Sequence, residues 1–160
     1  MVDPGHNQGV TPTAPTSALG APVRLNLTYG REYRLSVVSL GLACCAVEVS
    51  AAALRALAAR TSPEPVAPGR GPVTVLVIAG TVTDKLAPVV REIYEELPAG
   101  SRVISFGACS NSGGPYWDSY CVTKGVDQLV PVDLYVPGCP PRPEALLDAL
   151  HRLGAGDAGG

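Results

Sequence analysis

The stretch VTVLVIA, residues Val73–Ala79, constrains the fold more than any other part of this 160-residue sequence. A continuous run of apolar and β-branched residues predicts a strand that is buried on both faces, as the strands of parallel sheets are. Parallel strands need crossover connections, which are usually helices that cover the faces of the sheet. The sequence therefore predicts an α/β fold.

Strand-like and helix-like segments alternate on both sides of this run. We expect further strands at residues 34–40, 102–106 and 132–136, and helices at residues 46–60, 86–97 and 143–153. This alternation is typical of a doubly wound, mostly parallel sheet with flanking helices. In such sheets ligands bind beyond the carboxyl ends of the strands.

Each expected helix carries apolar residues at helical spacing, which predicts the face that packs on the sheet. These residues are Val47, Ala51, Leu54 and Ala58 in the first helix, Leu86, Val89, Val90, Ile93 and Leu97 in the second, and Leu146, Leu147, Leu150 and Leu153 in the third.

The ends of the chain differ in composition from the middle. Residues 1–22 are rich in Gly, Pro, Thr and Ser, and we expect a flexible arm over residues 1–30. The α/β domain is expected over residues 31–153, followed by a flexible tail over 154–160. Residues 61–72 contain several prolines, so we expect an irregular segment there.

Charge and hydropathy exclude some classes of function. The chain has 12 basic and 14 acidic residues and a net charge of −2, with no basic stretch, so we expect no nucleic acid partner. Its most apolar window, residues 35–57, is interrupted by Glu48 and Arg55, so no membrane-spanning helix is expected. The first 20 residues lack the pattern of a signal peptide, which predicts a cytoplasm-like compartment.

Four of the five cysteines follow expected strands. Cys44 and Cys45 come after the first strand, Cys109 after the third and Cys139 after the fourth. Because carboxyl ends of parallel strands share an edge, these four thiols are expected at one place. Four thiolates are the ligand set of an iron–sulfur cluster. The fifth, Cys121, does not follow a strand and is expected to be structural rather than a ligand.

Roles without a cluster stay open for the cysteines at this point. A single free cysteine is often a small buried hydrophobe, and Cys44 and Cys45 could form a vicinal disulfide. The paired knuckles of structural zinc sites and the cysteine run of bacterial ferredoxins are both absent. Disulfides are not favoured in a reducing compartment.

Several further residues lie close to the cysteines in the sequence. Glu48 lies one helical turn after the cysteine pair, either as a solvated or capping carboxylate or as a residue facing a cluster or a partner. The aromatic residues Tyr116, Trp117 and Tyr120 are expected to pack over the loop that carries Cys109, and Asp133 is expected to bond to neighbouring backbone.

Four motifs resemble the 20 kDa-type iron–sulfur subunit of NADH–quinone oxidoreductase, respiratory complex I. They are GLACCAVE (41–48), AGTVTDKLAP (79–88), VISFGAC (103–109) followed by Gly113 and Gly114, and VPVDLYVPGCPPRPEAL (130–146). The resemblance covers roughly residues 35–153. It implies a flavodoxin-like α/β fold, with a cluster at the carboxyl edge of the strands.

By this resemblance Cys44, Cys45, Cys109 and Cys139 fall on the ligand positions of one 4Fe–4S cluster. The implied function is electron transfer through that cluster to quinone, within an NADH:quinone oxidoreductase (translocase) and without catalysis by this chain alone. The implied partners are a ferredoxin-like subunit and a larger quinone-side subunit. These would hold the chain peripherally on the cytoplasmic side of a bacterial-type cell membrane.

The sequence also departs from the family pattern. The Pro-rich segment 61–72 stands where relatives have an Arg-Phe-Gly element and a strand, and Val49 and Ser50 stand where they have two methionines. These departures are compatible with a divergent copy of the subunit. Two alternative functions remain: the small electron-transfer subunit of a related membrane-associated hydrogenase, and a scaffold module of the same fold without a cluster.

Overall fold

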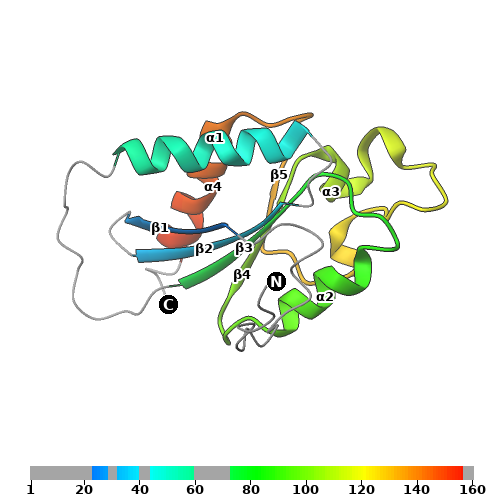
Figure 1. The fold of residues 1–160 in the computed structure, drawn as a ribbon, viewed down its shortest axis with the longest axis horizontal. Coiled ribbons are helices and arrows are strands. Elements are labelled where there is room, and N and C mark those ends of the chain that lie inside the picture. Colours follow the sequence, from blue (N-terminus) through cyan, green and yellow to red (C-terminus); the bar gives the residue numbers. More distant parts are fainter. Residues whose placement is uncertain (1–22, 29–31, 40–43, 60–72, 157–160) are drawn as a thin grey trace, which may run out of the picture.

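The computed structural model of the chain describes residues 23–28, 32–39, 44–59 and 73–156 (Figure 1). Residues 1–22 of the expected arm, the irregular segment 61–72 and the last residues of the expected tail, 157–160, lie outside the described residues.

The centre of the molecule is a five-stranded sheet in the order β1-β2-β3-β4-β5. Its strands are β1 (Val23–Thr28), β2 (Glu32–Ser39), β3 (Val73–Ala79), β4 (Arg102–Phe106) and β5 (Leu134–Val136). Strands β2 to β5 pair in parallel, and β1 pairs with β2 antiparallel. Strands β3 and β4 have the bounds that the sequence predicted.

Strand β1 lies inside the stretch that was expected to be a flexible arm. It pairs residue by residue with β2, from Val23 with Val37 to Thr28 with Glu32, and forms one edge of the sheet. The sheet therefore begins before the expected domain boundary at residue 31. The segment VRLNLT alternates apolar and polar residues, which is the pattern of a half-buried strand, so its sequence did contain a signal.

Helices cover both faces of the sheet. Helices α1 (Cys44–Ala59) and α4 (Pro143–Gly156) lie on one face, and α2 (Ala87–Glu95) lies on the other (Figure 1). Shorter helical turns, α3 (Ala108–Ser112), η2 (Gly114–Tyr116) and η3 (Val126–Gln128), follow β4. This arrangement confirms the predicted α/β, flavodoxin-like class with a mostly parallel sheet.

The core has two layers, one on each face, and β3 contributes to both. Val75, Val77 and Ala79 pack toward α1 and α4, whereas Leu76 and Ile78 pack toward α2. All five are buried, as expected for a strand covered on both sides. Strand β3 is therefore apolar at successive positions because its two faces contact two different layers of the core.

The predicted core faces were right for two helices and wrong for the third. In α4, Leu146 and Leu150 are buried, and in α2, Val90 is buried with Leu86, Ile93 and Leu97 packed around it. In α1, however, Val47 and Leu54 are 68% and 67% exposed. The face of α1 that packs on the sheet consists instead of Cys45, Val49, Ala52 and Ala56.

Asp133 joins β4 to the segment before β5, and it bonds to neighbouring backbone as expected. Its carboxylate accepts hydrogen bonds from the Val103 backbone N–H at 2.7 Å and from Arg102 Nη1 at 2.9 Å. Its own N–H donates to the Val103 carbonyl at 2.9 Å. These bonds fix the register of β5, which leads directly to Cys139.

Candidate functional site

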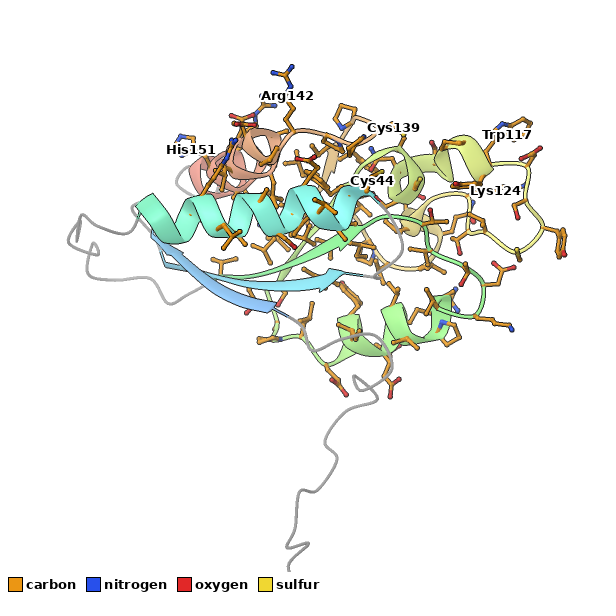
Figure 2. The ribbon with its side chains drawn as sticks, turned by 45° about the horizontal axis from the view of Figure 1, so that its top comes forward. Cys44, Trp117, Lys124, Cys139, Arg142 and His151 are labelled. Atoms are coloured by element: carbon orange, nitrogen blue, oxygen red, sulfur yellow. The ribbon has the colours of Figure 1, made fainter. Side chains whose placement is uncertain are left out.

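The carboxyl edge of the sheet gathers the four cysteines that follow strands. Cys44 and Cys45 are the first residues of α1, after β2. Cys109 lies in α3, directly after β4, and Cys139 lies just after β5. Figure 2 shows Cys44 and Cys139 near each other, beside the N-terminal end of α1. All four follow strands as expected, but the cysteine pair opens a helix and does not sit in a loop.

Cys45 is the thiol with which the others interact. Its side chain is only 2% exposed. Burial is the main cause that raises the pKa of Cys45 from 9.0 to about 11, and the thiols of Cys44, Cys109 and Cys139 contribute because thiolates repel one another. A hydrogen bond with Cys44 acts in the same direction. The thiols of Cys44, Cys109 and Cys139 are therefore each close enough to Cys45 to raise its pKa.

The four thiols differ in their exposure to solvent. Cys45 and Cys109 are buried, whereas Cys44 and Cys139 are exposed. Within the part of the chain that the structure describes, no three His, Cys, Asp or Glu side chains meet in the geometry that binds one metal ion. At this edge of the sheet, two of the four thiols thus face the core and two face the solvent.

Glycine lets the backbone approach the buried thiol. Gly107 has φ = 95°, and a Cβ atom at this position would lie 2.5 Å from Cys45 Sγ. Gly138, next to Cys139, has φ = 145°, and a Cβ there would lie 2.6 Å from Pro141 Cα. Only glycine fits both the conformation and the space at these two positions.

The loops that carry Cys109 and Cys139 are bonded to each other. The Gly107 N–H donates to the Val136 carbonyl at 2.9 Å, and the Ala108 N–H donates to the Gly138 carbonyl at 2.8 Å. These bonds continue the pairing of β4 with β5 past the ends of the strands. The relative position of the two loops is therefore set by main-chain contacts.

Polar side chains behind Cys109 were not predicted from the sequence. Ser105 and Ser110 are fully buried, and Asn111 is half-buried beside them. A signal was available, since Ser105 interrupts the apolar strand VISF. Buried hydroxyl groups need hydrogen-bond partners, so a polar residue in such a strand indicates a network.

The residues after Cys109 do not lie as expected. The side chains of Tyr116, Trp117 and Tyr120 are exposed, Tyr120 by 97%, so the prediction that they pack over the cysteine loop was wrong. Figure 2 shows Trp117 and Lys124 on the segment that extends away from Cys44. Cys121 is exposed as well, with its sulfur 3.3 Å from Ser119 Oγ.

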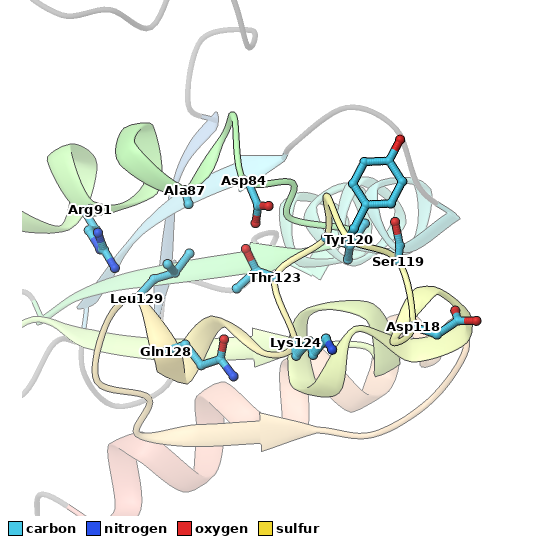
Figure 3. Close-up of a pocket in the computed structure, with 11 residues that line it drawn as sticks. Asp84, Ala87, Arg91, Asp118, Ser119, Tyr120, Thr123, Lys124, Gln128 and Leu129 are labelled. Carbon is cyan, nitrogen blue, oxygen red and sulfur yellow. The ribbon is translucent and has the colours of Figure 1, made fainter.

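A separate pocket of about 600 Å³ lies between the start of α2 and the segment 118–129 (Figure 3). Its charged lining residues are Asp84, Arg91, Asp118 and Lys124. None of the four strand-end cysteines lines it. With two acidic and two basic groups, the pocket favours neither sign of charge in a ligand.

Comparison with known proteins identifies the family of this chain. The family described as "NADH ubiquinone oxidoreductase, 20 Kd subunit" matches residues 42–153, a range that includes all five cysteines and strands β3 and β4. The chain belongs to this family.

Individual members of the 20 Kd subunit family give the same result. The chain is 56% identical over 138 residues to the B-type subunit, copy 1, of NADH-quinone oxidoreductase from Salinispora tropica, covering 86% of this chain and 73% of that protein. It is 56% identical over 133 residues to the B-type subunit, copy 2, from Streptomyces griseus subsp. griseus, covering 82% of this chain and 57% of that one. The chain thus spans little more than half of the Streptomyces relative.

A more distant relative is the B-type subunit of NADH-quinone oxidoreductase from Heliobacterium modesticaldum, which is 47% identical over 128 residues. The match covers 79% of this chain and 73% of that protein. Together with the family match, these identities confirm the family inferred from the four sequence motifs.

Among solved structures, a chain of the membrane-bound sulfane sulfur reductase, an archaeal respiratory membrane complex, is 31% identical with a TM-score of 0.49. That match covers 69% of this chain and 65% of the other.

Proposed function

We propose that this chain is the electron-transfer subunit of an NADH–quinone oxidoreductase and holds one 4Fe–4S cluster through Cys44, Cys45, Cys109 and Cys139. The observation that carries the proposal is that Cys44, Cys45, Cys109 and Cys139 follow the carboxyl ends of three parallel strands, in a chain that belongs to the 20 Kd subunit family. Four thiols from three separate segments match the donor set of an iron–sulfur cluster.

The surroundings of the thiols fit such a group. Each thiolate of a four-iron cluster binds a different iron, so the four sulfurs need not converge on a single point. Because Gly107 has no Cβ atom, its backbone can lie close to the sulfur of Cys45. The buried residues Val49 and Phe106 exclude water from the inner side of the edge.

The chain contributes binding, orientation and exclusion of water. A bound 4Fe–4S cluster supplies the transfer of single electrons. The thiol of Cys45 must lose its proton to become a ligand, and burial opposes this loss until a positive metal charge is present. No residue of the site needs to act as a general acid or base.

The open side of the site supports a role within a complex. Cys44 and Cys139 are exposed, so partner subunits must cover this edge to keep water from it. We infer that a ferredoxin-like subunit donates electrons to this chain and that a larger subunit forms the quinone site with it. These partners hold the chain peripherally, on the cytoplasmic side of the membrane.

Among the described residues, no helix has the length and apolar character needed to cross a membrane.

Iron analysis of full-length protein prepared without oxygen tests the proposal. We expect about four irons and four sulfides per chain, and the electron paramagnetic resonance signal of a single cubane on reduction. Cys45→Ala and Cys139→Ala are expected to lose most of the iron. Cys121→Ala is the matched control and should retain it, since Cys121 makes its contact with Ser119 and not with Cys45.

Two outcomes would contradict the proposal. Full iron content in the Cys139→Ala protein would remove this residue from the ligand set. Wild-type protein that takes up no iron under these conditions would favour a scaffold without a cluster.

A further inference from the structure

A buried network of polar side chains lies behind Cys109, between β4 and α3. Ser105 Oγ lies 2.6 Å from Asn111 Oδ1 and 3.1 Å from Ser110 Oγ. Ser110 Oγ lies 2.9 Å from the Phe106 carbonyl and 3.1 Å from the Gly107 carbonyl. Ser105 and Ser110 are both 0% exposed, so these bonds satisfy hydroxyl groups that water cannot reach.

One member of this network reaches across to the other cysteine loop. Asn111 Nδ2 donates to the Val136 carbonyl, 25 residues away in sequence, at 3.1 Å. The same carbonyl accepts the Gly107 N–H at 2.9 Å, and a carbonyl oxygen has two lone pairs for these two donors. Val136 is the last residue of β5, three positions before Cys139.

Ser105 fixes the direction in which the Asn111 amide points. A hydroxyl has one proton to donate, and the shorter of its two contacts, at 2.6 Å, is to Asn111 Oδ1. With its oxygen held by Ser105, the amide turns its NH2 group toward Val136. The opposite orientation would set two carbonyl oxygens against each other and lose the bond to Val136.

We propose that Asn111 is a positioning residue that fixes the loop of Cys109 against the loop of Cys139, with Ser105 as its anchor. The inference rests on the proposed function, because it concerns the distance between two of the proposed ligands. Its basis is geometric: Asn111 lies two residues after Cys109, and its bond partner lies three residues before Cys139. Removing the side-chain bond leaves the two main-chain bonds to hold the loops together.

Ser112 provides a matched control on the same short helix. Its hydroxyl donates to the Ala108 carbonyl at 3.3 Å, within α3, and its side chain is exposed. Ser112→Ala thus removes a side-chain hydrogen bond of α3 without touching β5. Asn111→Ala removes both bonds of the amide, and Asn111→Asp keeps the oxygen that faces Ser105 but replaces the donor that faces Val136.

The first test uses full-length protein without iron and does not depend on the cluster. Exchange of the Gly107 and Ala108 amide protons is followed by NMR, because both donate across the two loops. Loss of one hydrogen bond of ordinary strength predicts exchange about fivefold faster in Asn111→Ala and in Asn111→Asp. Ser112→Ala should exchange at the wild-type rate. Unchanged exchange in both Asn111 variants would overturn the proposal.

The second test uses the reconstituted protein. Asn111→Ala is expected to shift the g values of the reduced cluster and to release iron to a chelator about fivefold faster, whereas Ser112→Ala retains both wild-type properties.

Wild-type spectra in Asn111→Ala would refute the positioning role even though the cluster is present. Absence of a cluster from wild-type protein would instead refute the proposed function, while the exchange experiment would still decide the inference. If Asn111→Ala does not fold, Asn111→Asp, which has nearly the same shape, carries the exchange test and decides the inference.

Discussion

Gly107 and Cys45 approach each other so closely that no side chain fits between them. A Cβ at residue 107 would lie 2.5 Å from Cys45 Sγ and 3.4 Å from Pro141 Cδ. The backbone angles of Gly107, φ = 95° and ψ = 160°, add a conformational cost of about 1–3 kcal/mol for any L residue with a side chain. Contact and conformation therefore both require glycine here.

The first prediction separates the cost of the contact with Cys45 from the conformational cost of a positive φ. Gly107→Ala is expected to lose most of the bound iron, because Cys45 must move away from the other thiols to make room. Gly100→Ala is the control, since Gly100 also has positive φ, 84°, but has nothing within 4 Å of an added Cβ. It should lose about 1–2 kcal/mol of unfolding free energy and keep its iron. Equal iron loss in both variants would show that backbone strain alone disturbs the site.

The second prediction concerns the buried thiol of Cys45 in protein without iron. Its pKa is raised from 9.0 to about 11 in the folded state, so the folded protein holds this proton more tightly than the unfolded chain. The stability that results is fully present below pH 9 and is lost as the pH rises toward 11, by about 2–3 kcal/mol. Urea unfolding at several pH values measures this loss.

Cys45→Ser is the control, because a serine hydroxyl does not titrate in this range. Its unfolding free energy should show a smaller loss above pH 9 than that of the wild type. The same slope in both proteins would mean that another group titrates.

Among the elements, α1 is the one whose orientation the sequence did not predict. Its residues, CCAVEVSAAALRALAA, are apolar or small on nearly every side, so periodicity does not select one face. The buried stripe of Cys45, Val49, Ala52 and Ala56 consists of small side chains that allow close packing. Helix α4, by contrast, has polar residues between its leucines, and its core face was predicted correctly.

The third prediction contrasts the two faces of α1. Leu54→Gln should leave the unfolding free energy within about 0.5 kcal/mol of wild type, because Leu54 is exposed. Ala52→Leu should destabilise by about 1–3 kcal/mol, since the larger side chain has no room against the sheet. Chemical denaturation of both variants checks this. A larger loss in Leu54→Gln than in Ala52→Leu would restore the orientation expected from the sequence.

For the whole molecule, the location of the candidate site was easier to predict than its details. The collection of four cysteines at one edge follows from the parallel order of the strands alone. Which thiols are buried does not follow from it, because burial of Cys45 depends on how α1 faces the sheet. The bond from Asn111 to the Val136 carbonyl could not be predicted either, since it joins a side chain and a backbone group across two loops.

The last prediction concerns how the molecule is held in the cell. Exposed apolar side chains at Val47 and Leu54 on α1, and at Trp117 beyond α3, accompany the exposed thiols of Cys44 and Cys139. In the proposed complex, partner subunits would cover these side chains and the exposed thiols. We therefore expect the chain to fractionate with membranes and to be released by urea without detergent, because its attachment runs through partners. In cells that lack the larger quinone-side subunit, the chain should leave the membrane fraction and lose iron in air. Recovery of the full-length chain as a stable soluble monomer with intact iron, in cells that contain all partners, would contradict its proposed place in a respiratory complex.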